Sequence, residues 1–347
     1  MKKIPAKATY ERDLQEKSSQ GGSWIASVGP VSAELDRAIK TVVRQCMGIE
    51  PGEDVLVVCN PVTEEIGALM RIEAQGDGAD ATLAVISERD SHAAEPPRAV
   101  AAAMAAADVV LAPTIQSLSH TAARRAASEA GVRVASLPGV TEEMLSRLMT
   151  GDLEEIRRRG WAVVTALNSG SEAHLTCRHG SDLRVGLEGR RGIVDAGEIS
   201  SRGAFGNLPC GEGYIAPMEG TAEGTLVVDG SIAGVGLLET PSALTIRDGH
   251  LVETTGDDGA ALMDLLTLHG PDGTNVAELG IGTNEEAMLT GNILEDEKIL
   301  GTCHLAFGAS AAMGGSVQVP VHLDCVLLEP TLEIDGETIV SGGDLLV

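Results

Sequence analysis

The stretch Asp54-Val-Leu-Val-Val58 follows a turn at Pro51-Gly52 and is short, apolar and rich in valine, as buried strands are. Similar apolar stretches follow at 82–86, 108–112 and 132–135. Segments with apolar residues at helical spacing precede and separate these stretches, so that strands alternate with helices. This alternation predicts βαβ units and a mainly parallel sheet. The helices are expected from Ser32 to Gly48, from Thr63, near 98–107 and from Thr121 to Ala130.

After Trp161 the sequence changes to short apolar stretches divided by Gly, Asp and Asn, which is typical of antiparallel strands and tight turns. One helix is expected near 257–268. We therefore predict an α/β N-terminal domain at 31–160 with a mainly parallel sheet. A mixed, mainly antiparallel β (α+β) domain is predicted at 161–347, and residues 1–30 are predicted to be a polar N-terminal extension. The expected strands of the second domain include 174–177, 183–187, 224–229 and 243–247.

The composition limits the partners that this protein is expected to bind. Its 347 residues carry a net charge of −26, which repels nucleic-acid phosphates and anionic lipids. No apolar stretch approaches the roughly 20 residues of a membrane helix, and residues 7–20 are too polar for a secretory signal. Six cysteines without a C-x-x-C pair indicate reduced thiols. We expect a cytoplasmic protein that acts on a small molecule or peptide and binds neither nucleic acid nor membranes.

Metal-competent side chains occur in several short apolar segments of the second domain. His322-Leu-Asp324 would place an imidazole and a carboxylate on one face of a strand. A buried carboxylate needs a cation or hydrogen-bond donors, although the motif alone favours a structural His–Asp pair. His304 lies in a second apolar strand, which makes a metal site as plausible as a structural role. With Glu212 and Glu278, these residues suit Zn²⁺, Mn²⁺, Co²⁺ or Fe²⁺, and five ligands suffice for two ions if one carboxylate bridges them.

A segment of the first domain could also contribute to the site. His120 follows the strand that ends at Ala112, and open α/β sheets bind ligands beyond the carboxyl ends of their strands. His120 could make a local contact at a helix start, or it could reach the metal site as an acid, a base or a substrate contact. Thr121 and Arg124, which follow His120 in the sequence, are further substrate-binding candidates. The charged run Glu295-Asp-Glu-Lys298 is expected to be a solvated helix start.

Four motifs resemble the thermophilic aminopeptidase family of aminopeptidases T and S: N-L-P-x-G-E-x-x-x-A-P at 207–217, A-E-L-G-I-G at 277–282, H-L-A-F-G at 304–308 and H-x-D at 322–324. The resemblance implies homodimers with two divalent ions in the C-terminal domain, facing an enclosed cavity. It assigns the ligands to Glu212, Glu278, His304, His322 and Asp324. The sequence departs from that family at 308–313, where the catalytic tyrosine of the peptidases is absent.

The H-L-D motif and the E-G-T-L-V turn at 223–227 also resemble, more distantly, the 2,5-dihydroxypyridine dioxygenases. Those relatives imply a single Fe(II), a histidine where this chain has Glu278, no equivalent of His304, and a working histidine near His120. The ligand set of this chain follows the hydrolases instead.

The leading expectation is therefore an aminopeptidase-like metallohydrolase of a peptide or small-molecule amide bond, with two Zn, Mn or Co ions. Its catalytic residues would be Glu212, which shuttles a proton or bridges the ions, and His120. The alternative is a mononuclear non-haem Fe(II) dioxygenase that opens a hydroxylated ring, which needs two or three of the same ligands. A third hypothesis is a metal-stabilised protein without catalysis.

Overall fold

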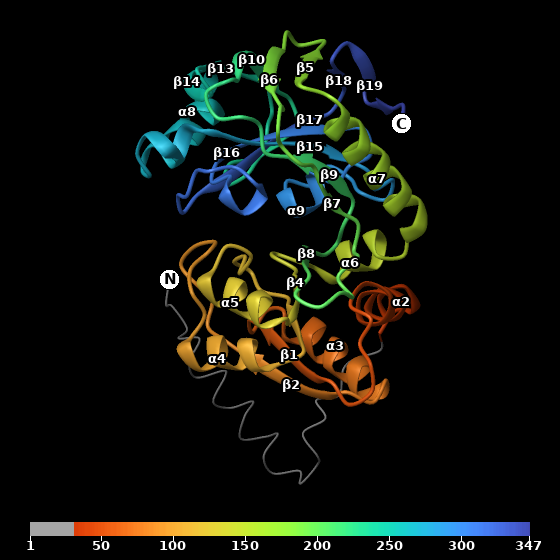
Figure 1. Ribbon diagram of the computed structural model, residues 1–347. Coiled ribbons are helices and arrows are strands. Elements are labelled where there is room, and N and C mark those ends of the chain that lie inside the picture. Colours follow the sequence, from red (N-terminus) through yellow and green to blue (C-terminus); the bar gives the residue numbers. More distant parts are fainter. Residues whose placement is uncertain (1–30) are drawn as a thin grey trace, which may run out of the picture. The chain divides into compact units, whose positions relative to one another are not determined.

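The computed structural model of the chain describes residues 31–347, drawn as a ribbon in Figure 1. The predicted extension at 1–30 lies outside the described residues. The described chain forms a five-stranded, an eight-stranded and a seven-stranded sheet. None of the helices within residues 31–347 has the length and apolarity needed to cross a membrane.

The five-stranded sheet is parallel throughout and has the order β2-β1-β3-β4-β8. Helices alternate with its first four strands, as the sequence predicts. The strands are β1 (Asp54–Cys59), β2 (Asp80–Val85), β3 (Val109–Ala112), β4 (Arg133–Ser136) and β8 (Phe205–Asn207). The helices are α2 (Ala33–Lys40), which continues as the π-helix η1 (Thr41–Cys46), α3 (Glu64–Gly76), α4 (Arg98–Ala106), α5 (Ala122–Ala130), α6 (Glu142–Leu148) and α7 (Leu153–Ser169).

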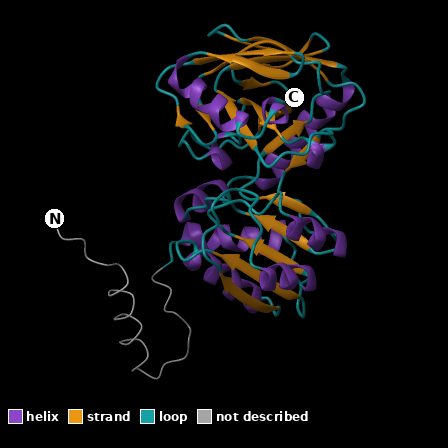
Figure 2. Cartoon of the chain, turned by 90° about the vertical axis from the view of Figure 1, so that its left-hand side faces the viewer, coloured by secondary structure: helices purple, strands orange, loops and turns teal. Residues whose placement is uncertain are grey.

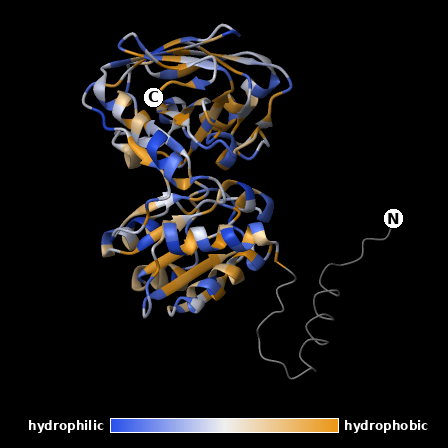
Figure 3. Ribbon diagram, turned by 90° about the vertical axis from the view of Figure 1, so that its right-hand side faces the viewer, coloured by the Kyte–Doolittle hydropathy of each residue, from blue (hydrophilic) through white to orange (hydrophobic). Residues whose placement is uncertain are grey.

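Both faces of the parallel sheet are covered by helices, which explains why β3, and β1 from Val55 onward, are apolar without interruption. Val55 and Val57 on β1 pack with α2, η1 and α3, whereas Leu56 and Val58 point to the opposite face and pack with α4 and α5. Figure 3 shows these strands as a mostly hydrophobic layer. The last strand, β8, comes from beyond residue 160, and the predicted domain boundary there stays a prediction.

The other two sheets are antiparallel and enclose a common apolar core (Figure 2). This mixed arrangement confirms the predicted fold class. The eight-stranded sheet contains, in order, β14 (His250–Thr254), β13 (Ser242–Arg247), β10 (Glu223–Val228), β6 (Asp182–Gly186), β5 (Glu172–Cys177), β18 (Pro330–Ile334), β19 (Glu337–Ser341) and β20 (Asp344–Leu345). The seven-stranded sheet contains β12 (Gly236–Leu237), β11 (Ser231–Ile232), β17 (His322–Leu327), β16 (Cys303–Gly308), β15 (Val276–Gly282), β9 (Glu212–Ile215) and β7 (Ile193–Asp195). The remaining helices are α8 (Gly256–Thr267), η2 (Pro271–Thr274), α9 (Ile293–Asp296) and η3 (Ala311–Met313).

Candidate metal centre

The five predicted ligands converge because they lie on four adjacent strands of the seven-stranded sheet. Glu212 is on β9, Glu278 on β15, His304 on β16, and His322 and Asp324 on β17. Glu278 and Asp324 both pair across the sheet with Ala306, His304 pairs with Gly280, and Glu212 pairs with Gly282. Residues paired in this way, and residues two apart on a strand, share one face of a sheet. The other face packs into the apolar core.

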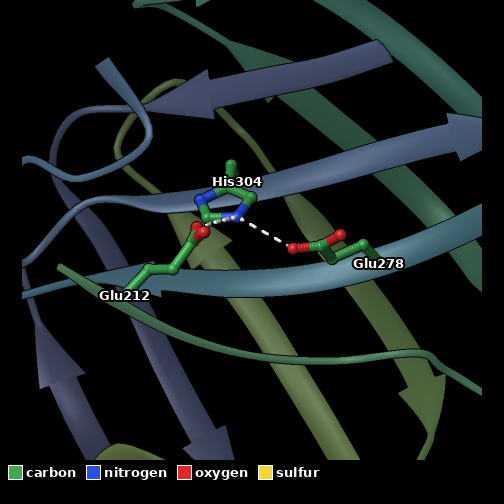
Figure 4. Close-up of side chains that lie close together, drawn as sticks. All are labelled: Glu212, Glu278 and His304. Carbon is green, nitrogen blue, oxygen red and sulfur yellow. Dashed lines mark hydrogen bonds and ion pairs between the residues drawn. The ribbon is translucent and has the colours of Figure 1, made fainter. Parts of the chain in front are cut away.

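Three of the ligands form a deep group in which two carboxylates approach one imidazole (Figure 4). His304 Nε2 lies 3.2 Å from Glu212 Oε2 and 3.4 Å from Glu278 Oε1. The His304 side chain is fully buried. Burial opposes its protonation, but Glu212 and Glu278 raise the pKa of His304 well above its ordinary value. A cation at this point would replace that proton between the same three side chains.

A second, shallower group shares Glu278 and adds His322 and Asp324. His322 Nε2 lies 3.2 Å from Glu278 Oε2 and 3.5 Å from Asp324 Oδ1. The carbonyl oxygen of Ala309 lies 2.9 Å from His322 Nδ1, which fixes the ring so that Nε2 faces the carboxylates. Burial opposes the ionisation of Asp324, yet His322 lowers the pKa of Asp324 to about 2. The His322 side chain is 15% exposed and that of His304 is 0% exposed, so the second group is the accessible one.

The residues fit a divalent metal by the chemistry of their donors and by their incomplete hydrogen bonding. Each group offers three imidazole or carboxylate atoms that lie within 4.8 Å of one another. His304 Nδ1 is buried without a hydrogen-bond partner within residues 31–347, and Glu212 Oε2 has only its ion pair with His304. In the shallow group the Glu278 and Asp324 carboxylates share the His322 imidazole, and a divalent ion there would offset both of their charges. This chain therefore carries a cluster suited to a divalent metal ion.

The prediction that Glu295-Asp-Glu-Lys298 is solvated is wrong. Glu295, Asp296 and Lys298 are at most 1% exposed, and each charge has partners. Glu295 pairs with Arg147 at 2.6 Å, and Asp296 accepts hydrogen bonds from the backbone of Thr290 and Gly291. These contacts come from segments distant in sequence or from a turn, and the charge run itself does not indicate them.

Lys298 lies next to the ligand cluster, although the sequence motifs did not place it there. Its Nζ lies 2.7 Å from Glu212 Oε1, 2.5 Å from Glu297 Oε1 and 3.9 Å from Asp195 Oδ2. Burial opposes its charge, but these carboxylates raise the pKa of Lys298 well above its ordinary value. One ammonium cannot offset three buried carboxylates, and burial raises the pKa of both Asp195 and Glu297 to about 8. Lys298 therefore stays a cation beside the metal cluster.

His120 lies beside the shallow group, as one of the two sequence interpretations proposed. Its ring centroid is 5.9 Å from that of His322. Burial, followed by the nearby His322 and Arg124, lowers the pKa of His120 to about 4. The imidazole is therefore neutral at physiological pH and can accept a proton.

Thr121 and Arg124 make contacts among the elements of the parallel sheet and its helices. The fully buried Thr121 accepts a hydrogen bond from the Arg124 backbone and so caps α5. The Arg124 guanidinium donates to the Ser119 carbonyl at 2.7 Å and stacks over the Phe205 ring at 4.3 Å. Their substrate-binding role stays a prediction.

Tyr214 is a further residue on the ligand-bearing face that the motifs did not single out. It follows Glu212 by two positions on β9 and pairs with Gly280, which in turn pairs with His304. Burial and the Glu278 and Glu212 carboxylates raise the pKa of Tyr214 well above its ordinary value. Its hydroxyl therefore keeps its proton and can donate a hydrogen bond. Two-residue alternation from Glu212 could have indicated it.

Comparisons with known proteins give one consistent sequence match. A family model described as 2,5-dihydroxypyridine 5,6-dioxygenase matches residues 34–347. A 2,5-dihydroxypyridine 5,6-dioxygenase of Pseudomonas putida KT2440 is 25% identical over 263 residues, which cover 70% of this chain and 72% of that protein. These findings contradict the expectation of an aminopeptidase-like metallohydrolase.

Two solved structures share the fold. The 2,5-dihydroxypyridine dioxygenase from Pseudomonas putida KT2440 superposes with a TM-score of 0.81 at 22% identity and covers 92% of this chain and 99% of its own. Wild-type AmpT from Thermus thermophilus has a TM-score of 0.68 at 19% identity, with coverages of 90% and 99%. At these identities the likeness is one of fold.

Proposed function

This chain belongs to the 2,5-dihydroxypyridine 5,6-dioxygenase family, and we propose that it is an Fe(II)-dependent dioxygenase that opens a dihydroxylated aromatic ring. The observation that carries this proposal is the accessible group of Glu278, His322 and Asp324 beneath a neutral His120. The reaction consumes one O₂ for each ring. It breaks one ring carbon–carbon bond, and both oxygen atoms enter the product.

Glu278, His322 and Asp324 would hold the iron through one imidazole and two carboxylates. This departs from the histidine that the resemblance implies at Glu278, and it leaves three donors of the imidazole and carboxylate types that non-haem iron sites use. Fe(II) bound there would supply the redox chemistry with O₂. The Ala309 carbonyl holds His322 in one orientation, so that its Nε2 is presented to the ion.

His120 would act as the base that takes the proton of a ring hydroxyl. Its low pKa keeps it neutral, and it lies on the accessible side of the ligand group. Tyr214 would donate a hydrogen bond to an oxygen of the substrate, because it is protonated and on the same face as Glu212 and Glu278. The two residues would orient a planar, dihydroxylated ring over the accessible side. Assembly into homodimers stays a prediction.

The test is oxygen consumption by protein loaded anaerobically with Fe(II) and then mixed with 2,5-dihydroxypyridine and other dihydroxylated aromatic rings. We expect equimolar loss of O₂ and of one ring substrate, and two ¹⁸O atoms in the product from ¹⁸O₂. Protein with an Asp324→Ala change, treated in the same way, should consume no O₂ above buffer. Iron-loaded wild-type protein that leaves every ring intact would overturn the proposal.

A further inference from the structure

Lys298 lies on the far side of Glu212 from the imidazole of the deep group. Glu212 Oε1 accepts a hydrogen bond from Lys298 Nζ at 2.7 Å, while Glu212 Oε2 lies 3.2 Å from His304 Nε2. An ion on Glu212, Glu278 and His304 would therefore share one carboxylate with a fixed ammonium. Like charges at such short range in a buried site repel strongly, because little water screens them.

Resting on the function proposed above, we propose that Lys298 is a built-in cation that takes the place of a second metal ion. In this view Lys298 neutralises Glu212 and keeps the deep group free of metal. A single ion is then directed to Glu278, His322 and Asp324. The five ligands include enough donors for two ions, and the charge of Lys298 thus determines that only one ion binds.

The backbone around Lys298 holds the ammonium in this place. The Lys298 carbonyl accepts a hydrogen bond from the Asn284 backbone at 2.9 Å. The segment runs so close to β15 that a Cβ at Gly282 would stand 2.0 Å from the Ile299 carbonyl oxygen. The side chain is fully buried and held by Glu212 and Glu297, so it has no room to move into solvent. These contacts make the charge a permanent part of the centre.

The two ligand groups also differ in solvent exposure, and this difference too favours an ion at the shallow group. Both His304 and Lys298 are 0% exposed, whereas His322 is 15% exposed and lies next to His120. Of the two groups, the shallow group is therefore the one closer to solvent. The deep group contributes buried charge next to the shallow group and binds no ion itself.

The test counts metal ions in wild-type protein and in a Lys298→Met variant, which keeps the length of the side chain and removes its charge. Both are stripped with a chelator, titrated with Zn²⁺ by calorimetry, desalted and analysed for zinc. We expect one ion per chain in the wild type and two in the variant. A Lys40→Met variant on α2, where the lysine is exposed, should keep one ion. Anomalous diffraction at the zinc edge should place the second ion between Glu212 and His304.

Removal of Lys298 leaves buried carboxylates unpaired, so folding is checked by circular dichroism and thermal melting. A Lys298→Met, Glu297→Gln double variant removes one positive and one negative charge. It replaces the single variant in the zinc count if the single variant does not fold. Two ions in the wild type, or one ion in a folded variant, would overturn the inference. The zinc count does not depend on turnover. If the wild type binds one ion and the variant binds two, but no ring is cleaved, the proposed function is refuted and the role of Lys298 stands. If the wild type cleaves a ring and binds two ions, the role of Lys298 is refuted and the proposed function stands.

Discussion

Gly280 lies directly opposite His304 on the neighbouring strand, and a Cβ at Gly280 would stand 2.0 Å from His304 Nε2. Because Gly280 has no side chain, the imidazole of His304 can lie across β15 at this position. The glycine at 280 in the A-E-L-G-I-G motif is thus a steric requirement of the metal cluster.

Replacement of Gly280 by alanine should destabilise the protein, because the methyl group overlaps a buried ring that cannot retreat. We expect the free energy of unfolding in urea to fall by about 1–3 kcal/mol. Gly76→Ala at the end of α3 is the matched control, since a Cβ there meets nothing within 4 Å. It should be neutral or stabilise by roughly 0.5–1 kcal/mol. Equal stabilities of the two variants would refute this role of Gly280.

Replacement of Asp324 by alanine should abolish tight iron binding, because it removes a charged ligand whose pKa of about 2 keeps it ionised. Iron content after anaerobic loading and desalting should fall at least about tenfold. Glu337→Ala, at an exposed position on β19, should leave the iron content unchanged. Retention of iron by the Asp324 variant would show that the ion is held elsewhere.

A His120→Gln variant should keep its iron and lose turnover. The side chain lies beside the ligand group and is not itself a ligand, so metal content should equal that of the wild type. Loss of a general base lowers kcat by about 10²–10⁴-fold. His179→Gln, on an exposed turn, is the control for loss of a histidine. An unchanged kcat in the His120 variant would leave the histidine with a structural role.

Replacement of Tyr214 by phenylalanine should weaken substrate binding more than it slows the chemical step. Loss of one hydrogen bond of about 1–1.5 kcal/mol corresponds to a KM that rises about 5–13-fold. Steady-state kinetics on the iron-loaded variant measures both constants. If KM stays at the wild-type value, the hydroxyl does not contact the substrate.

His120 also makes stability depend on pH. Its pKa falls from 6.5 to about 4 on folding, so between these values the unfolded chain binds more protons than the folded one. Stability should therefore decrease as pH falls through this window, by up to about 2 kcal/mol at pH 5. Urea unfolding with chelator present, at pH 7.5 and pH 5, should show a smaller decrease for His120→Gln than for wild type. Parallel decreases would contradict the low pKa.

Much of the fold follows from local pattern. The apolar stretch that contains Val55 and Val57 is buried on both faces, and it alternates with helices, so a parallel sheet was predictable. The ligands His322 and Asp324 were predictable as neighbours, because they are two apart on one strand. Their meeting with Glu278 depends on strand register, which spacing along the chain does not encode.

The sequence motifs placed the hydrolase above the dioxygenase alternative that the comparisons favour, and they did not predict that Lys298 is buried. The five ligands match the peptidase pattern, whereas the family model that matches residues 34–347 is that of the dioxygenases. Lys298 stands in a run of acids that looks solvated. Its burial follows from contacts with Glu212 and Asp195, which are 86 and 103 residues away along the chain. Charge pairing over such distances leaves no local trace in a sequence.

One short segment connects the edge of the parallel sheet to the first of the ligand-bearing strands. Residues 205–207 form β8 at the edge of the parallel sheet, and β9 begins only five residues later with Glu212. A fragment that ends at residue 160 would lack the edge strand, and a fragment that begins there would carry it without its partner β4. The two halves are therefore poor modules for exchange by recombination.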